Sequence, residues 1–334
     1  MKKILIIKFS AIGDVFMAMP HIDAILSAHK KDEVWLLTSR LFMDFFARHP
    51  RLKAVELDPG RRISKNSALG RTLWARRQKF DAVCDLQGNR VSRRIARHSG
   101  APVRAGTQPS GAYNFHPERP YTNQSRTHVT GRLDETLESA GLPRSGKGFS
   151  AYPSPEDEKK VAEWKEKNGV ADGGHAILHA GSSKGWESKR WPGSHYRDLA
   201  LRLEAEGVRC VWVGGREDRE INREMARWAG IDATGHFSLM GLYLMGKNAK
   251  LAVCNDSAPM HIMAAAGAPT YGFFGPTSWM KNHASGQRRR VIQNDSPCSP
   301  CFSGKCPPDR NHMCLDAISP GEVFDTIRRD LPLS

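Results

Sequence analysis

The sequence predicts two open α/β domains, each built around a parallel β-sheet. Short and almost continuously apolar runs alternate with amphipathic stretches along the whole chain, which is typical of parallel strands covered by helices on both faces. The length of 334 residues is about twice that of a typical domain. With 40% hydrophobic and 25% charged residues, the composition is that of a globular protein with substantial cores.

The predicted elements follow one another in this order. In the first domain, apolar runs predict strands at 4–8, 33–38, 80–86 and 103–106. In the second domain, they predict strands at 176–180, 208–214, 251–255 and 270–274. Amphipathic spacing predicts helices that include 14–29, 194–206, 217–228 and 258–266.

The segment 143–155 is rich in Gly, Ser and Pro and is the predicted linker. We therefore expect an N-terminal domain of residues 1–150 and a second domain of residues 151–318. A helix start is predicted at Pro155, where acidic residues occupy the first turn. A C-terminal helix is expected within 319–334, because Ser319 and Glu322 form a capping box with proline at the first helical position.

The N-terminus is similar to a signal peptide only over its first few residues. A short apolar run follows two lysines, but Lys8 and Asp14 interrupt it and no small-residue cleavage site follows. The longest apolar runs are far shorter than the roughly 20 residues of a bilayer span. The sequence therefore predicts an intracellular, cytoplasmic protein without a membrane-spanning helix.

Charge is distributed unevenly between the two halves. Residues 1–150 carry 26 Lys and Arg against 13 Asp and Glu, whereas residues 151–334 carry 24 against 22. The first half thus has a net charge of +13 and the second half +2. A basic half indicates an anionic partner, such as a nucleic acid, an anionic membrane surface or an acidic substrate. A charge that only keeps the protein in solution is the alternative.

The first predicted strand runs into the turn 9–15, which is where doubly wound folds bind their ligands. This turn contains one glycine, so the dinucleotide fingerprint G-x-G-x-x-G is absent, and G-x-x-x-x-G-K-[ST] occurs nowhere in the chain. The turn therefore gives little support to a nicotinamide-dinucleotide or P-loop site. Asp14 lies where the next helix begins, and it is either an N-cap or a carboxylate that acts as a general base.

The strand at 176–180 leads into Gly181, Ser182 and Ser183, and Lys189 follows. Small hydroxyl residues, free backbone N–H groups and a cation after a strand are typical of a phosphate-binding turn. A plain loop is the alternative.

The strand at 251–255 leads into Asp256 and Ser257, and Pro259 and His261 follow in the first turns of a helix. The N-terminus of a helix offers N–H donors and a positive dipole end to an anion. Ser257 and His261 can add hydrogen bonds, and Asp256 can accept them from sugar hydroxyls. Alone, Asp256 is better explained as a helix cap, but together with the 181–183 turn the stretch predicts a site for a nucleotide diphosphate.

Three sequence elements occur in the same order in one enzyme family. They are the turn 10–15, the run Lys189-Arg190-Trp191-Pro192, and the stretch 256–261 followed by Gly275-Pro276-Thr277. Over nearly its whole length, the chain resembles glycosyltransferase family 9, the ADP-heptose:lipopolysaccharide heptosyltransferases. The resemblance implies the GT-B architecture, in which two Rossmann-like domains face each other across a cleft. It implies that the N-terminal domain takes a lipid acceptor and the C-terminal domain takes a nucleotide sugar.

The resemblance also implies roles for the matching residues. Asp14 corresponds to the aspartate that deprotonates the acceptor hydroxyl, and Lys189 corresponds to the lysine that neutralises the diphosphate. Ser182, with Ser183 beside it, lies at the hydroxyl-bearing turn next to that diphosphate. Glu217 corresponds to a glutamate near the adenosine ribose. The donor-binding stretch is matched by Asp256, Ser257, Ala258 and His261, with Ala258 where many members have glycine.

The implied reaction is an inverting transfer of heptose from ADP-heptose. Charge develops on the leaving phosphate, and oxocarbenium character develops on the sugar. We expect Lys189 and the helix N-terminus before Met260 to stabilise the leaving group, and Asp14 to act as the single base. No cofactor is expected to be required for catalysis.

The implied acceptor is the inner core of lipopolysaccharide on lipid A, which is anionic through its Kdo carboxylates and phosphates. Such an acceptor would explain why the first half of the chain is basic. The same positive charge would attract the protein to the cytoplasmic face of the inner membrane, where we expect it to bind peripherally. The expected acceptor or membrane face is a set of arginines one helical turn apart, Arg90, Arg93, Arg94 and Arg97. A solvated helix face is the alternative.

Four of the seven cysteines lie in one segment rich in Pro, Ser and Gly, namely Cys298, Cys301, Cys306 and Cys314. In an intracellular protein, this grouping favours a metal or redox site over a disulfide framework. Four thiolates could hold a structural Zn²⁺ ion or an iron–sulfur cluster. The spacing after the first pair is irregular, so disulfides and unligated thiols are the alternatives.

Two further functions compete with the heptosyltransferase hypothesis. One is another GT-B transferase that uses a UDP- or GDP-sugar, and protection from heat by ADP but not by UDP would argue against it. The other is a basic nucleic-acid-binding protein with a zinc-stabilised loop, which predicts a recognition helix or basic residues interleaved with aromatic ones. The sequence contains no such arrangement around a known motif, and we expect no nucleic-acid partner.

Overall fold

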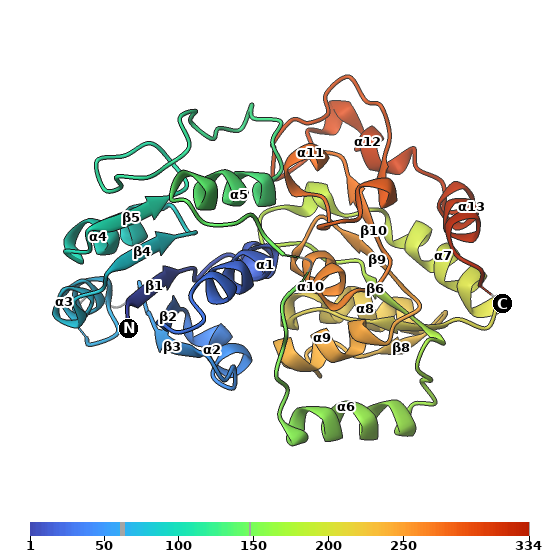
Figure 1. The fold of residues 1–334 in the computed structure, drawn as a ribbon. Coiled ribbons are helices and arrows are strands. Elements are labelled where there is room, and N and C mark those ends of the chain that lie inside the picture. The colour runs from blue at the N-terminus through green and yellow to red at the C-terminus, as the bar shows by residue number, and fades with distance from the viewer. Residues whose placement is uncertain (61–63, 147, 334) are drawn as a thin grey trace. The chain divides into compact units, whose positions relative to one another are not determined.

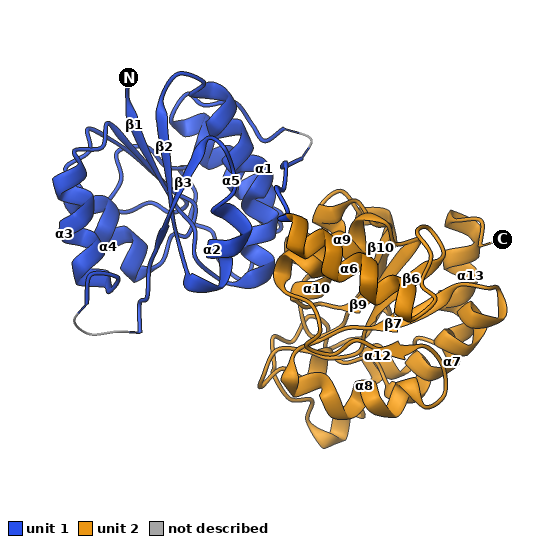
Figure 2. Cartoon of the chain, turned by 90° about the horizontal axis from the view of Figure 1, so that it is seen from below, with its two compact units in different colours: residues 1–154 blue, residues 155–334 orange. Residues whose placement is uncertain are grey.

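The computed structural model describes residues 1–60, 64–146 and 148–333. The chain divides into two compact units, Met1–Ser154 and Pro155–Ser334 (Figure 2). The boundary between them lies inside the predicted linker 143–155. Lys147 of that linker and Ser334 of the predicted last helix fall outside the described residues.

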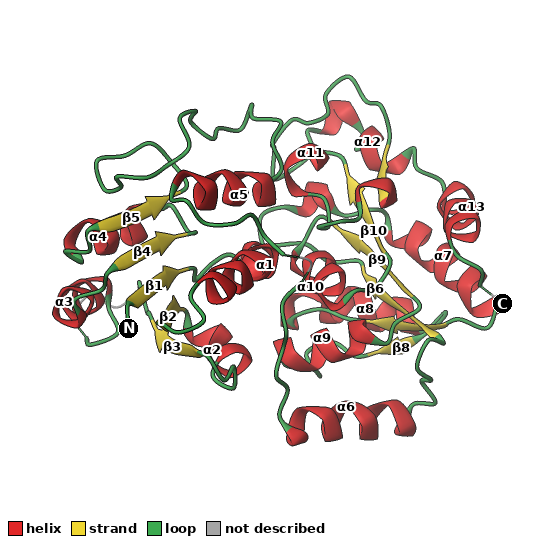
Figure 3. Ribbon diagram, in the orientation of Figure 1, coloured by secondary structure: helices red, strands yellow, loops and turns green. Residues whose placement is uncertain are grey.

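The first unit is built on an all-parallel sheet with the strand order β3-β2-β1-β4-β5 (Figures 1 and 3). The strands are β1 (Lys3–Ile7), β2 (Glu33–Thr38), β3 (Leu52–Glu56), β4 (Ala82–Asp85) and β5 (Val103–Gly106). The helices are α1 (Ile12–Ala28), α2 (Arg40–Phe46), α3 (Ala68–Gln78), α4 (Arg90–His98) and α5 (Val129–Ser139). In the register, Ile7 of β1 is paired with Leu37 of β2 and with Asp85 of β4.

The second unit is also built on an all-parallel sheet, with the strand order β11-β10-β9-β6-β7-β8. The strands are β6 (His175–His179), β7 (Arg209–Trp212), β8 (Ile231–Asp232), β9 (Leu251–Asn255), β10 (Thr270–Phe274) and β11 (Val291–Gln293). The longer helices are α6 (Pro155–Lys167), α7 (Gly193–Ala205), α8 (Arg219–Ala226), α9 (Leu239–Lys247), α10 (Ala258–Ala266) and α13 (Pro320–Asp330). The shorter helical segments include Glu187–Lys189, Arg216–Asp218, α11 (Trp279–Asn282) and α12 (Met313–Asp316).

The strand order reverses beside the first strand of each unit. The neighbours of β1 are β2 and β4, and the neighbours of β6 are β7 and β9. In open α/β folds, ligands bind outside the carboxyl ends of the strands at such a switch point. The turns that leave β1, β4, β6 and β9 are therefore the places where functional side chains are expected. The turns after β1, β6 and β9 carry motifs that the sequence singles out.

All of the predicted strands are present, and those at 33–38, 103–106, 251–255 and 270–274 have the predicted bounds. Three further strands, β3, β8 and β11, were not predicted. Each lies at the edge of its sheet, where a strand needs fewer apolar residues. Only Leu52 of β3 is buried, and none of the residues in β8 and β11 is. An analysis based on apolar runs therefore misses them.

The C-terminal helix belongs to the core of the second unit. Ser319 accepts a hydrogen bond from the N–H of Glu322, and the Glu322 carboxylate accepts one from the N–H of Ser319, which confirms the predicted capping box. The helix α13 packs beside α7 (Figure 1) and buries Val323, Phe324 and Ile327 in the same core as the sheet. None of the helices in the described part of the chain combines the length and apolar character needed to cross a bilayer.

Candidate active site

Asp14 lies at the carboxyl edge of the first sheet, in the first turn of α1. It is the third residue of that helix, and its carboxylate accepts a hydrogen bond from the N–H of Ala11 at 3.2 Å. Ala11 is the N-cap residue, so Asp14 is not the N-cap that the sequence allows. The side chain instead closes the first turn from within the helix and is half-buried.

The turn before Asp14 is held by a residue from the neighbouring strand end. The side-chain carbonyl of Gln87, which follows β4, accepts hydrogen bonds from the N–H groups of Phe9 and Ser10 at 3.1 and 3.0 Å. Its amide nitrogen donates to the Ser10 hydroxyl at 3.2 Å. Gln87 thus fixes the path of the chain into α1. The sequence did not reveal this residue, because its partners are 77 and 78 residues away.

A buried lysine follows β1, and a buried aspartate ends the neighbouring strand β4. Lys8 is 4% exposed. Burial lowers the pKa of Lys8, and the negative charges of Asp14 and Asp85 oppose that shift. Asp85 is completely buried and accepts hydrogen bonds from the Tyr113 hydroxyl and from the N–H of Gln87. Burial raises the pKa of Asp85, and these donors oppose the rise. The charge of Lys8 therefore interacts with the carboxylates of both Asp14 and Asp85.

Tyr121, from the long segment between β5 and α5, also belongs to the surroundings of Asp14. Burial raises the pKa of Tyr121 to about 12, and the charge of Asp14 contributes to the rise. Its hydroxyl donates to the carbonyl of Thr127 at 3.0 Å. The guanidinium of Arg132 lies 5.8 Å from its ring centroid and donates to the carbonyl of Thr107 at 2.8 Å. Arg132 thereby ties this segment to α5, a contact that no motif indicated.

In the second unit, Lys189 and Asp256 form an ion pair. Lys189 ends the short helical turn Glu187–Lys189, and Asp256 directly follows β9. The Lys189 Nζ and Asp256 Oδ2 atoms are 2.8 Å apart, and the side chains are 15% and 6% exposed. Thr277 donates a hydrogen bond to the same carboxylate oxygen at 2.6 Å. The structure therefore joins the predicted phosphate-binding lysine, the predicted donor-binding aspartate and the Gly275-Pro276-Thr277 motif in one network.

The turn after β6 is connected to the end of β9 by Asn255. The side chain of Asn255 accepts a hydrogen bond from the N–H of Trp191 at 3.0 Å and donates to the carbonyls of residues 180 and 181 at 2.9 Å each. Ser182, in the same turn, is buried and accepts a hydrogen bond from Arg190 Nε at 3.0 Å. Asn255 thus sets the shape of the predicted phosphate-binding turn by joining two neighbouring strand ends to the start of α7.

Three buried side chains form a chain of contacts from Ser257 through His179 to Asp218, which we call the Ser257–His179–Asp218 chain. Ser257 is the N-cap residue of α10, and its Oγ lies 2.9 Å from His179 Nδ1 and 3.1 Å from the carbonyl of Asn255. The tautomer of His179 decides which of the two side chains donates the hydrogen bond between them. His179 Nε2 lies 3.5 Å from Asp218 Oδ2. The chain therefore orients the hydroxyl at the N-terminus of α10.

Asp218, next to the predicted Glu217, is a buried acidic residue of the turn after β7. A Cβ atom at Gly181 would lie 1.9 Å from Asp218 Oδ1, and one at Gly214 would lie 2.5 Å from Oδ2, so this close approach requires glycine at both positions. Burial alone raises the pKa of Asp218, but the hydrogen bond and charge of His179, with other polar neighbours, lower it overall. Glu217 is exposed beside this turn.

The remaining donor-binding predictions lie at the same edge of the second sheet. Ala258 is the first residue of α10, and His261 lies one turn further on and is 7% exposed. Ser183 is exposed, unlike its neighbour Ser182. Lys189 and Asp256 are brought into direct contact, whereas Ser183 and Glu217 are simply accessible near the turns.

The predicted arginines lie on α4 and differ in exposure. Arg90, Arg94 and Arg97 are exposed, whereas Arg93 is half-buried and donates a hydrogen bond to the carbonyl of Asn89 at 3.4 Å. Asn89 caps the helix. Because α4 begins just after β4 ends, Arg90 and Arg93 lie nearer to the carboxyl edge of the sheet than Arg94 and Arg97 do.

The four cysteines of the segment 298–314 are free thiols. Cys314 is buried, and its pKa is raised to about 11, first by burial and then by the charges of Cys298, Cys306 and Cys301. Within the ranges that the structure describes, no group of three or more His, Cys, Asp or Glu side chains is arranged to hold a metal ion. The predicted metal site therefore stays a prediction.

The segment 298–314 also packs against the turn that carries Lys189. Ser188 donates a hydrogen bond to the carbonyl of Ser303 at 2.6 Å, and its own carbonyl lies 2.7 Å from His312 Nε2. The N–H of Phe302 donates to the carbonyl of Pro276 at 2.7 Å. The cysteine-containing segment thus supports both Lys189 and the Gly275-Pro276-Thr277 motif.

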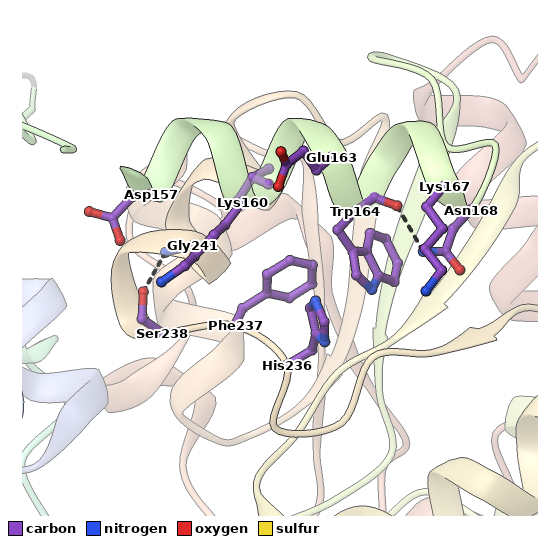
Figure 4. Close-up of a pocket in the computed structure, with 11 residues that line it drawn as sticks. Asp157, Lys160, Glu163, Trp164, Lys167, Asn168, His236, Phe237, Ser238 and Gly241 are labelled. Carbon is purple, nitrogen blue, oxygen red and sulfur yellow. Dashed lines mark hydrogen bonds between the residues drawn. The ribbon is translucent and has the colours of Figure 1, made fainter. Parts of the chain in front are cut away.

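The second unit contains a cavity of about 700 Å³ between α6 and the residues that lead into α9 (Figure 4). The ring centroids of Trp164 and Phe237 in its lining are 5.0 Å apart in an edge-to-face arrangement. Ser238 accepts a hydrogen bond from the N–H of Gly241 at 3.1 Å and caps α9. None of the predicted donor-binding residues lines this cavity.

Comparison with known proteins gives one family. The model of "Glycosyltransferase family 9 (heptosyltransferase)" matches residues 67–312. The chain is 27% identical over 321 residues to lipopolysaccharide heptosyltransferase 1 of Pseudomonas aeruginosa. The aligned region covers 91% of this chain and 87% of that relative.

Solved structures show the same fold. The chain is similar to a glycosyltransferase family 9 protein from Veillonella parvula, with a TM-score of 0.81, 22% identity, and coverage of 98% of this chain and 96% of that one. It is also similar to the Escherichia coli heptosyltransferase WaaC solved with ADP, with a TM-score of 0.70, 19% identity, and coverage of 98% and 99%. These similarities, with the two all-parallel sheets, confirm the predicted GT-B fold class.

Proposed function

The chain belongs to glycosyltransferase family 9, the heptosyltransferases, and we propose that it transfers heptose from ADP-heptose to the inner core of lipopolysaccharide, on a Kdo-lipid A or heptosyl-Kdo acceptor. The observation that carries this proposal is the ion pair of Lys189 and Asp256 at the N-terminus of α10. A relative of the same fold was solved with ADP, which supports an adenine nucleotide as the leaving group.

The donor diphosphate is assigned to the turn after β6 and to the N-terminus of α10. The unpaired N–H groups and the positive dipole end of a helix attract phosphate oxygens. Lys189 then exchanges its contact with Asp256 for the phosphate as negative charge develops on the leaving oxygen. The Asp256 carboxylate, released by the lysine, is free to accept a hydrogen bond from a sugar hydroxyl.

Asp14 is assigned as the general base. The acceptor hydroxyl oxygen bonds to the anomeric carbon while the bond from that carbon to the phosphate oxygen breaks. The bonding electron pair leaves with ADP, and the hydroxyl proton passes to the Asp14 carboxylate. One displacement of this kind inverts the anomeric configuration. The hydrogen bond from Ala11 and the contacts of Gln87 support this role, because they hold the carboxylate in one place.

The acceptor is assigned to the basic first unit. Arg90 and Arg93 lie in the first turn of α4, near the carboxyl edge of the sheet. Guanidinium groups suit the carboxylates and phosphates of a Kdo-lipid A acceptor. The net charge of +13 in residues 1–150 favours peripheral binding at the cytoplasmic face of the inner membrane, where such an acceptor is anchored.

The cysteine segment is a separate proposal. We propose that Cys298, Cys301, Cys306 and Cys314 hold a structural zinc ion or an iron–sulfur cluster. The support is that four free thiols fall within the one segment 298–314, a donor set that zinc ions and iron–sulfur clusters use. A bound metal would stabilise the segment that supports Lys189, and it takes no part in the transfer step.

Mass spectrometry of reaction products tests the transfer directly. The enzyme is incubated with ADP-heptose and lipopolysaccharide acceptors truncated at successive core positions, and the mass of one added heptose on an acceptor is the expected result. ADP should also raise the melting temperature more than UDP does. Transfer from a UDP- or GDP-sugar, and none from ADP-heptose, would replace the proposed donor.

A further inference from the structure

We propose that the outer face of α3 and α4 docks this protein onto an anionic lipid bilayer, with two leucines entering the headgroup region and arginines contacting lipid phosphates. We call this surface the α3–α4 face; it consists of Leu69, Leu73, Arg76, Arg77, Arg94 and Arg97. The proposal rests on the peripheral membrane binding of the proposed function and assigns the surface that makes the contact, which requires neither donor nor acceptor.

The α3 part of this face has two apolar side chains directed to solvent. Leu69 and Leu73 are 45% and 50% exposed, and Arg76 and Arg77 in the next turn are also exposed. Positions i, i+4, i+7 and i+8 lie on one side of a helix. The exposed side of α3 is therefore apolar in its first half and cationic in its second half.

These leucines are directed outwards because other residues attach α3 to the sheet. The half-buried Trp74 packs on Phe80 and on Trp35 of β2, with ring centroids 5.5 and 5.7 Å apart. Thr72 and Ala75 are buried on the same side. The core contacts of α3 are therefore made by other residues, and Leu69 and Leu73 are left exposed to solvent.

The α4 part repeats the same spacing with arginines alone. Arg94 and Arg97 of the face are exposed, as is Arg90 one turn before Arg94, so that the three lie at positions i, i+4 and i+7. The two helices pack side by side in the first unit (Figures 1 and 2). A Cβ atom at Gly100, just after α4, would lie 4.0 Å from the Arg76 guanidinium. The exposed sides of both helices therefore contribute to one surface.

The charged residues of the α3–α4 face are all positively charged. The sequence has no Asp or Glu between Asp58 and Asp81, or between Asp85 and Glu118. Among the residues that the structure describes, none of the arginines of the α3–α4 face has a carboxylate within ion-pair distance. The arginines of α8 differ, because glutamates alternate with them.

Exposed leucines within an arginine-rich surface favour a lipid interface. Each Lys or Arg near an anionic leaflet contributes to binding, and apolar side chains that enter the boundary of the acyl chains add to it. A nucleic acid would match the arginines but not the leucines, since its outer surface is phosphate. The α3–α4 face therefore fits an anionic bilayer better than a nucleic acid.

Vesicle co-sedimentation of the full chain, without donor or acceptor, tests the proposal. Vesicles of phosphatidylcholine with phosphatidylglycerol should bind the protein, and vesicles of phosphatidylcholine alone should not. The double variant Leu69→Ser/Leu73→Ser should reduce the partition coefficient about tenfold at unchanged charge. Arg94→Gln/Arg97→Gln should reduce it about 30-fold, from about 1 kcal/mol for each arginine.

Matched variants in the second unit serve as controls. Leu201 of α7 is 44% exposed, and Leu201→Ser should bind the vesicles like the wild type. Arg219→Gln/Arg223→Gln on α8 should reduce binding much less than the α4 pair does. Equal melting temperatures would show that the variants are folded.

Three results would overturn the docking proposal. They are equal binding to both kinds of vesicle, wild-type binding by the leucine variant, and tighter binding to a DNA or RNA duplex that the leucine variant retains and the arginine variant loses. None of them bears on transfer to a delipidated acceptor, so a failure of docking is distinguishable from a failure of the proposed reaction.

Discussion

The imidazole of His179 and the hydroxyl of Ser257 meet at 2.9 Å across the switch point of the second sheet. His179 is the last residue of β6, and Ser257 is the N-cap residue of α10, the helix that follows β9. Since β6 and β9 are neighbours in the sheet, this contact joins the turn of Ser182 to a helix N-terminus. The two sources of backbone N–H groups to which we assign the donor diphosphate are thereby held in a fixed relation.

Replacing His179 with phenylalanine should weaken donor binding and lower the free energy of unfolding. Ser257 and Asp218 lose a buried polar partner, which costs about 1–3 kcal/mol for each group left unsatisfied. Urea unfolding and the KM for ADP-heptose are the measurements. His195→Phe in α7, outside the Ser257–His179–Asp218 chain, is the control. A folded His179→Phe protein with the wild-type KM would contradict the positioning role.

The Lys189→Met variant should raise the KM for ADP-heptose at least tenfold, because the cation that receives the leaving phosphate is removed. It also leaves the buried Asp256 carboxylate with Thr277 as a partner but without its cation, which costs up to about 3 kcal/mol of stability. Steady-state kinetics and thermal unfolding measure the two effects. Lys184→Met, at an exposed position of the segment between β6 and α7, should change neither. An unchanged KM and kcat in Lys189→Met would remove the lysine from the donor site.

The Asp14→Asn variant should lose transfer activity by about 10²–10⁴-fold, the usual contribution of a general base. The amide oxygen can still accept the hydrogen bond from Ala11, so the first turn of α1 should remain folded. Isothermal titration with ADP should give the wild-type affinity. Asp23→Asn, on the same helix, controls for the loss of a negative charge. Full turnover by Asp14→Asn would show that another group accepts the proton.

Acidification should weaken the attachment of α13 through Asp330. Burial raises the pKa of Asp330, but hydrogen bonds from Tyr271 and Arg290 lower it overall, below the ordinary value of 3.8. Such a carboxyl stabilises the fold above its unfolded pKa, and this contribution is lost as the pH falls through the folded pKa.

The difference in the free energy of unfolding between wild type and Asp330→Asn should therefore be constant from pH 7 to about 5 and vanish below the folded pKa. Urea unfolding across this pH range measures it. Asp325→Asn, an exposed position on the same helix, should give no such difference. A difference that grows on acidification would have the wrong sign for this ion pair.

Elemental analysis should find zinc or iron in the purified protein, and the Cys301→Ser variant should lose it. Removal of the metal by a chelator should raise the KM for ADP-heptose, because the 298–314 segment supports the turn of Lys189 through Ser188. Cys210→Ala, in β7, should keep the metal. If the wild-type protein is purified without a chelator and contains no metal, the four thiols are unligated and the proposed metal site is wrong.

Local patterns in the sequence predicted those features that depend on neighbouring residues. The strand at 251–255 has the predicted bounds because all of its side chains are buried and its first four are apolar. The capping box of Ser319 and Glu322 forms because its two hydrogen bonds join residues three positions apart. The edge strands β3, β8 and β11 were missed, because an edge strand is defined by its partner rather than by its own apolar residues.

The sequence by itself determined the family, the two parallel sheets and the turns in which Asp14, Lys189 and Asp256 lie. Only the tertiary structure decided which side chains meet there: that Gln87 holds the turn before Asp14, and that Asp218 is buried while its neighbour Glu217 is exposed. Burial and hydrogen bonding are set by segments that pack together from distant parts of the chain, and no local pattern records those contacts.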